Sequence, residues 1–171
     1  MNIKNIHERK IKASARTVGE LLDSVSSSED KIWPVENWSK IKFDRPLEVG
    51  AIGGHGAIKY KVIEYNPSSS IKFKFTKDLE GYHEMVITEI NRNECLLRHS
   101  IYAKVTGFMI FLWPIMIRPL HNALIEDLLD KVEIQLSSVK SPKLWNSWVK
   151  LLRRLIGMHS SKKSFDINIK E

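Results

Sequence analysis

The alternation of apolar and polar residues predicts several β-strands before residue 106. Residues 6–13 alternate between turn-like flanks, and residues 60–66, 71–76, 82–90 and 95–105 follow the same period of two. Such a period is typical of strands with one buried face. The segment NRNE provides a turn between the last two strands. Connections this short favour an antiparallel meander over parallel strands that are joined by helices.

Other stretches have the spacing of helices. Residues 14–25 place four apolar side chains on one helical face behind Ser14, a candidate N-cap. Residues 26–38 are typical of a short helix or a turn that Pro34 interrupts. From about residue 107 to residue 139 the pattern predicts a long helix. Its apolar stripe and the prolines that kink or delimit its entry are Leu120, Leu124, Leu128, Val132, Leu136, Pro114 and Pro119.

This order of elements predicts an α+β domain in which a curved antiparallel sheet wraps around the last helix. A strongly curved sheet needs bulges, and glycine supplies them. The segment GAIGGHGAIKY, residues 50–60, holds four of the eight glycines, and we interpret it as the bend that lets the sheet curl. No predicted helix follows it, which argues against a phosphate-binding loop. His55 faces the inside of the sheet only if a bulge resets the register of this strand.

Composition indicates a cytoplasmic protein with one core. The chain has 171 residues, of which 43% are hydrophobic. The single cysteine, Cys95, forms no intrachain disulfide and suits a reducing compartment. The first ten residues lack the apolar region of a secretory signal. The longest apolar run, residues 105–117, is too short to span a bilayer and predicts a buried element.

The positive charge is concentrated at the end of the chain. The net charge of +7 divides into +1 for residues 1–139 and +6 for residues 140–171. Residues 141–157 predict an amphipathic helix with Ser141 as N-cap, Pro142 at its first position and Gly157 at its end. Its apolar and aromatic face opposes a basic face, which suits either an anionic membrane surface or docking onto the domain or a second copy. Candidate contact residues are Trp145, Trp148, Lys150, Leu152, Arg153 and Arg154; nucleic acid is not a predicted partner.

Six segments in this order resemble the SRPBCC superfamily, the START and Bet v 1-like helix-grip group, and most closely its bacterial polyketide cyclase/dehydrase-like members. They are WPVENW, PLEVGAIGGHGAIKY, FKFT, GYHE, LLRHSIYAK and WPIMIRPLHNALIEDLLDK. The resemblance implies a seven-stranded antiparallel sheet that grips a long helix, with a hydrophobic cavity between them. Members bind lipids, polyketides or other apolar small molecules, and only some are enzymes. The predicted organisation is a helix-grip domain over residues 1–139, a basic helix over 140–157 and a flexible tail over 158–171.

Strand alternation predicts which side chains face that cavity. His83 shares the parity of Met85 and Ile87, and His99 that of Leu97 and Ile101, whereas Tyr82 and Tyr102 point outward. His121 lies beside the apolar stripe of the long helix. The candidate cavity residues are His55, Tyr60, Phe73, Phe75, His83, Met85, His99, Ile101, Trp113, Ile117, His121 and Leu124.

The histidines have three interpretations. Each is a buried polar group satisfied by a neighbour such as Tyr60, Glu84 or a backbone carbonyl; or they orient polar groups of a ligand; or they serve catalysis or metal binding. No metal-ligand spacing is present, so neither a metal nor another cofactor is predicted. Cys95 is a candidate nucleophile, although a lone buried cysteine usually fills apolar space.

The sequence thus predicts a protein that binds an apolar small molecule of lipid or polyketide type and that visits a membrane through its basic helix. The alternative is a cyclase, dehydratase or hydrolase that uses the cavity histidines as acid and base. The superfamily has no shared catalytic motif, so the resemblance carries over no catalytic residue.

Overall fold

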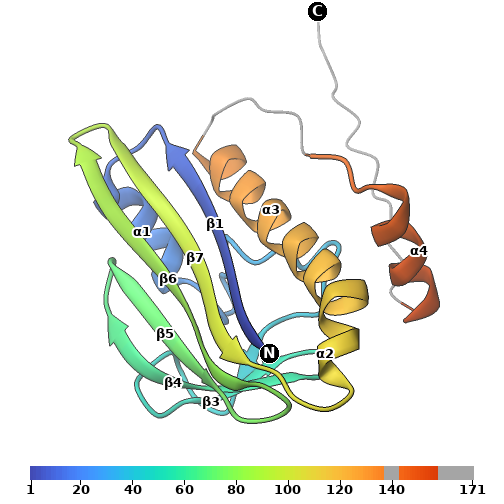
Figure 1. Ribbon diagram of the computed structural model, residues 1–171. Helices are drawn as coiled ribbons and strands as arrows, with labels where there is room; N and C mark the ends of the chain where they lie inside the picture. The colour runs from blue at the N-terminus through green and yellow to red at the C-terminus, as the bar shows by residue number, and fades with distance from the viewer. Residues whose placement is uncertain (137–142, 158–171) are drawn as a thin grey trace, which may run out of the picture.

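A seven-stranded antiparallel sheet curves around a long helix in the residues that the computed structural model describes, 1–136 and 143–157 (Figure 1). The strands lie in the order β1-β7-β6-β5-β4-β3-β2. They are β1 (Asn2–Ile11), β2 (Lys42–Phe43), β3 (Ile52–His55), β4 (Ile58–Asn66), β5 (Ser70–Phe75), β6 (Glu80–Asn91) and β7 (Glu94–Lys104). The helical elements are α1 (Ala15–Asp23), α2 (Met109–Leu112), the π-helical turn η1 (Trp113–Ile117), α3 (Arg118–Gln135) and α4 (Ser147–Leu155). This architecture confirms the predicted α+β helix-grip fold.

Short polar contacts hold the first helix and the segment after it. The Ser14 hydroxyl accepts a hydrogen bond from the Thr17 backbone N–H over 3.1 Å and so caps α1 as predicted. Residues 26–41 form turns and no helix. Of the two alternatives predicted for residues 26–38, the turn is therefore correct and the short helix is not. The Asp30 carboxylate accepts from the backbone N–H groups of Ile32 and Trp33 over 3.0 and 2.8 Å. These bonds fix the turn that carries Trp33 into the core.

The glycine-rich segment is a hairpin and not one bent strand, which corrects our interpretation. β3 pairs antiparallel with β4, and the tight turn between them contains Gly56 with a φ of +53°. Because His55 pairs with Ile58 across this turn, the two side chains lie on the same face of the sheet. His55 therefore faces inward without any bulge. A left-handed φ is the reason that glycine suits the turn.

The long helical region follows the predicted stripe. Pro114 lies at the start of η1 and Pro119 at the start of α3, where a missing backbone N–H costs little. In α3, Leu124, Leu128 and Val132 are buried, and Ile125 and Leu129 extend the same face. These residues share one side of the helix because they recur every three or four positions.

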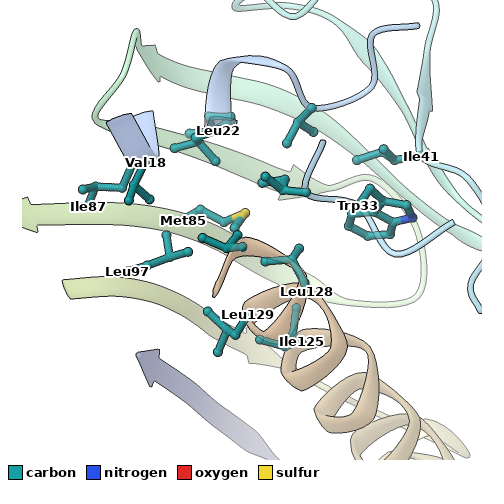
Figure 2. Close-up of a cluster of buried hydrophobic side chains, with 14 of the residues drawn as sticks. Val18, Leu22, Trp33, Ile41, Met85, Ile87, Leu97, Ile125, Leu128 and Leu129 are labelled. Carbon is teal, nitrogen blue, oxygen red and sulfur yellow. The ribbon is translucent and has the colours of Figure 1, made fainter. Parts of the chain in front are cut away.

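The core lies between the concave face of the sheet and two helices. In Figure 2, Met85 and Leu97 on the sheet point toward Ile125 and Leu128 of α3. In the same figure α1 contributes Val18 and Leu22, which lie near Ile87. The loop residues Trp33 and Ile41 complete this cluster. Burial of these side chains on both helices is the main force that holds the layers together.

The appended helix is shorter than predicted. α4 spans Ser147–Leu155, and its N-cap is Asn146, whose side chain accepts from the Val149 N–H over 2.9 Å. The predicted cap residues Ser141 and Pro142, and the predicted tail 158–171, lie outside the described residues. Val149, Leu152 and Arg153 are buried, and α4 packs beside α3 (Figure 1).

We predict that Gly53→Ala destabilises the protein by about 1–3 kcal/mol, because an added methyl group overpacks the contact between β2 and β3. A Cβ at Gly53 would lie 1.9 Å from the Lys42 carbonyl oxygen. Gly56→Asn is the control, since asparagine tolerates left-handed φ and the nearest atom to a Cβ there is 3.8 Å away. Urea unfolding followed by circular dichroism measures both; equal stability of the two variants would contradict this account of the hairpin.

Candidate functional site

Five histidines of the described residues form a row across the concave side of the sheet. His7, His99 and His83 lie on β1, β7 and β6, where His7 pairs with His99 and Met85 pairs with His99 in register. His121 comes from the first turn of α3, and His55 ends β3. The row therefore joins three neighbouring strands, the hairpin and the helix that the sheet grips.

The rings follow one another at contact distance. The ring centroids of His83 and His99 are 5.6 Å apart, those of His99 and His121 are 5.0 Å apart, and those of His121 and His7 are 6.0 Å apart. At the other end, Tyr60 lies 4.8 Å from His83 and 5.9 Å from His55. The four histidines predicted from the sequence thus belong to one cluster, and Tyr60 links His55 to the other three.

Aromatic side chains surround the middle of the row. Phe73 and Phe75 stack on His83 with centroid distances of 4.7 and 4.9 Å. Trp33 packs on His55 at 5.0 Å and was not among the predicted cavity residues. The other candidates divide between two buried clusters: Met85 and Leu124 lie in the larger one, and Ile101, Trp113 and Ile117 belong to a smaller one with Phe75.

Three imidazole nitrogens in this row have no hydrogen-bond partner within the described residues. They are Nε2 of His83, Nδ1 of His99 and Nδ1 of His121, and all three are shielded from solvent. A buried polar atom without a partner is uncommon and costs free energy of folding. The interpretation in which every histidine is satisfied by a neighbour therefore does not describe these three. Glu84, one of the suggested partners, has its carboxylate 3.6 Å from the Lys72 ammonium group.

The two ends of the row are satisfied. His55 Nδ1 lies 3.2 Å from the Tyr60 hydroxyl. His7 has a partner at each nitrogen, with Nδ1 2.9 Å from Glu126 Oε1 and Nε2 3.1 Å from Asn122 Oδ1. Sequence reasoning missed His7, although it shares strand parity with the buried Ile3 and Ile11. The signal was weak because Asn5 and Arg9, also on that face, are polar.

Burial keeps these imidazoles neutral. It lowers the pKa of His55 to about 4, with the Lys59 charge as a smaller contribution. It also lowers the pKa values of His83, His99 and His121 well below the usual value, and the charges of other imidazoles in the row lower them further. Burial raises the pKa of the Tyr60 phenol. His55, His83, His99 and His121 are therefore uncharged hydrogen-bonding groups at neutral pH.

Other candidate chemistry finds no support in this region. No group of three or more histidine, cysteine or carboxylate side chains in residues 1–136 and 143–157 is arranged to hold a metal ion. Cys95 is buried, and burial raises the pKa of its thiol, which favours a role in packing over one as a nucleophile. The imidazoles of His55, His83, His99 and His121 remain the candidate chemical groups of this region.

A shallow groove of about 480 Å³ lies on the opposite, convex face of the sheet. Its lining includes Tyr82 and Tyr102, which point outward as the alternation predicted, with ring centroids 5.5 Å apart. Gly81 also lines it. None of the histidines contacts it, so the polar chemistry of the interior and this open groove are separate features.

A second polar cluster joins α4 to the domain. The Asp127 carboxylate accepts from the indole N–H of Trp38 over 2.7 Å and from that of Trp145 over 3.0 Å. The Arg153 guanidinium lies over both rings, 4.5 Å from the Trp38 centroid and 4.1 Å from that of Trp145. Among the predicted contact residues, Leu152 and Arg153 are thus buried against the domain itself. Trp148, Lys150 and Arg154 are exposed.

The arrangement of strands and helices is that of several solved structures. Norcoclaurine synthase from Thalictrum flavum, solved with dopamine and hydroxybenzaldehyde, is 16% identical, covers 82% of this chain and 90% of its own, and has a TM-score of 0.61. A protein from Thermobifida fusca is 10% identical over 84% of this chain and 99% of its own, with a TM-score of 0.62. CalU16 from Micromonospora echinospora is 12% identical over 91% of this chain and 87% of its own, with a TM-score of 0.56.

At these identities the likeness shows the fold alone, which is the helix-grip fold. No protein-family model matches this chain, and neither does any curated protein. No helix among the described residues is both long enough and apolar enough to cross a bilayer.

We predict that the protein loses stability as the pH falls from about 6.5 toward 4. The unfolded chain takes up protons on its histidines near pH 6.5, whereas the folded chain does not, because the pKa values of His55, His83, His99 and His121 are lowered. Stability is therefore full above the unfolded pKa, and each histidine lowers the free energy of unfolding by up to about 1.4 kcal/mol per pH unit below it.

Urea unfolding at a series of pH values from about 7.5 to about 4.5 measures this loss, because unfolded histidine titrates in this range. The double variant His99→Leu/His121→Leu lacks two of the four groups and is expected to show a shallower pH dependence. A free energy of unfolding that stays constant below pH 6.5, or an unchanged slope in the variant, would contradict the prediction.

Proposed function

We propose that this protein binds an apolar small molecule between the sheet and α3, and that the unpartnered imidazole nitrogens orient its polar groups. The observation that carries the proposal is the set of three buried nitrogens on His83, His99 and His121 without partners. A ligand hydroxyl or carbonyl at this position would satisfy them. A mostly apolar site with a few convergent polar groups is the usual composition of a small-molecule pocket.

The surroundings of the row favour an aromatic or aliphatic ligand. Phe73, Phe75 and Tyr60 contact His83 directly, and Ile101, Trp113 and Ile117 adjoin them. The rings touch one another, so a ligand enters by moving them apart. Norcoclaurine synthase, which shares the fold, is solved with two aromatic molecules. The sequence segments that resemble polyketide cyclase-like proteins point to the same class of apolar ligand.

Binding is better supported than acid–base catalysis. A general acid or base works best when its pKa lies near the operating pH. The pKa values of His83, His99 and His121 are instead lowered by burial, so these groups stay neutral and are weak bases.

The proposal also places the protein in the cytoplasm, on the support of its lone buried thiol.

The double variant His99→Leu/His121→Leu separates a binding role from a structural one. Removing two unsatisfied polar atoms should leave the free energy of unfolding at pH 7.5 unchanged or raise it by up to about 2 kcal/mol. The same variant should lose the ability to recognise a polar group on a ligand. Two fluorescent probes test this: 2-naphthol, and naphthalene, which lacks the hydroxyl group. Wild type should prefer 2-naphthol by about tenfold, and the variant should bind both alike.

His7→Leu is the matched control, because His7 lies in the same row and has partners at both nitrogens. It should be destabilised by about 1–3 kcal/mol and keep the preference for 2-naphthol. Native mass spectrometry of protein purified from its host should reveal a copurifying apolar compound. The proposal is wrong if neither probe binds and no compound copurifies, or if the double variant keeps the wild-type preference.

A further inference from the structure

The helical segment before α3 exposes a stripe of large apolar side chains. Phe108 is 74% exposed, Phe111 66% and Ile115 56%. They recur at intervals of three and four residues, so they lie on one side of the segment that α2 and η1 form. Exposed aromatic and aliphatic side chains that adjoin one another mark a binding surface.

α4 exposes a second stripe that adjoins the first. Trp148, Leu151 and Leu155 are exposed and recur at i, i+3 and i+7, next to the face that is buried through Val149 and Leu152. The Trp148 indole N–H donates to the carbonyl oxygen of Ile115 over 2.8 Å. This bond places the two stripes side by side and joins them into one surface. We call it the α2–α4 surface, and it consists of Phe108, Phe111, Ile115, Trp148, Leu151 and Leu155.

The charged residues of the two segments that carry this surface, 105–118 and 143–157, are all positive. Arg118 follows the first stripe, and Lys150 and Arg154 lie on the exposed side of α4 next to the second. Residues 95–125 contain no aspartate or glutamate, and neither do residues 143–157. The carboxylates of the neighbouring part of α3 are engaged elsewhere, with Asp127 bound to two indoles and Glu126 to His7. A partner of this surface therefore has to be apolar and negatively charged.

We propose that the α2–α4 surface lies on an anionic lipid bilayer, with the phenylalanines and Trp148 in the interface and the three cations among the headgroups. Aromatic and aliphatic residues beside lysine and arginine are the composition of helices that lie in a membrane surface. Indole rings with one exposed edge suit the boundary between headgroups and acyl chains. The inference goes beyond the proposed small-molecule function and does not rest on it.

A second copy of the chain fits this surface less well. A symmetric dimer would bring the same patch of both chains together, so Arg118, Lys150 and Arg154 would meet their own counterparts. Like charges without an intervening acid oppose such an interface. Phospholipid headgroups supply the missing negative charge, and acyl chains take up the apolar side chains.

The proposed surface differs from the one that the helix period alone predicted. Leu152 and Arg153 are buried against the domain, and Lys143 is bound to Asp130 and Glu126. In their place, the loop and helix before α3 supply half of the surface. A truncation of α4 would therefore remove only part of it, and point variants of the full chain test it better.

The test is flotation of the full-length protein with phosphatidylcholine vesicles that contain or lack phosphatidylglycerol. We expect binding to the anionic vesicles, and binding that weakens as salt concentration rises. Lys150→Glu/Arg154→Glu should weaken binding by about thirtyfold or more, since each cation contributes about fivefold and each reversed charge adds repulsion. Phe108→Ser/Phe111→Ser should weaken it by about tenfold or more through lost insertion.

Matched controls carry the same changes elsewhere on the surface. Val49→Ser/Ile52→Ser removes two exposed apolar side chains, and Lys59→Glu/Lys61→Glu reverses two exposed lysines on β4. Both should bind anionic vesicles as wild type does. Circular dichroism and urea unfolding confirm that each variant folds.

Tryptophan fluorescence gives a second readout. Trp33, Trp38 and Trp113 are buried and Trp145 is held between Asp127 and Arg153, whereas Trp148 is 44% exposed, so a blue shift on vesicle binding reports mainly on Trp148. Trp148→Phe should abolish most of that shift. The proposal is overturned if neutral and anionic vesicles bind alike, if the surface variants float like their controls, or if the chain dimerises through this surface and ignores vesicles.

Discussion

The position of α3 over the sheet depends on one arginine. Glu126, Asp130 and Glu133 recur along the side of α3 that faces β1, and Arg9 bonds to all three, over 2.9 Å to each of the first two. Burial opposes the Arg9 charge, but its bonds to Asp130 and Glu133 outweigh burial and raise its pKa. Without this cation, three neighbouring carboxylates would lose the one positive group that they all share, which is far more costly than the net gain of the paired state. The network therefore specifies where α3 lies.

The two other features of the molecule follow from that placement. His121, in the first turn of α3, comes within 5.0 Å of His99 because the helix is held against β1 and β7. One turn and a half further along, Asp127 faces away from the sheet and binds the indoles of Trp38 and Trp145, on which the Arg153 guanidinium rests. α3 thus closes the histidine row on one side and positions α4 on the other. Docking through Arg153 also turns Trp148 toward Ile115, so that the exposed apolar side chains of both segments gather in one place.

The sequence predicts those features that depend on a regular period with one buried face. The strands from β4 to β7 and the apolar stripe of α3 follow from such periods, as does the inward direction of His83 and His99. β2 has only two residues and β3 only four, which is too short for a period, so the hairpin was mistaken for a bent strand. His7 was missed because its neighbours on the inner face of β1, Asn5 and Arg9, are polar. Both form hydrogen bonds with side chains of α3. Arg153 was likewise expected to be exposed, and its burial depends on Trp145 and on Trp38, which is distant in sequence.

The neutral histidines are a feature that packing alone does not explain. Leucine or methionine at His99 or His121 would fill the same space without leaving a nitrogen unpaired. A row of imidazoles is therefore a cost to the free energy of folding, and it is the kind of local conflict that proteins retain where a ligand resolves it. Tyr60, at one end of the row, and Glu126, at the other, satisfy the terminal members. The three unpaired nitrogens lie between these ends, next to Phe73, Phe75 and the apolar cluster around Trp113, so polar and apolar recognition are combined in one place.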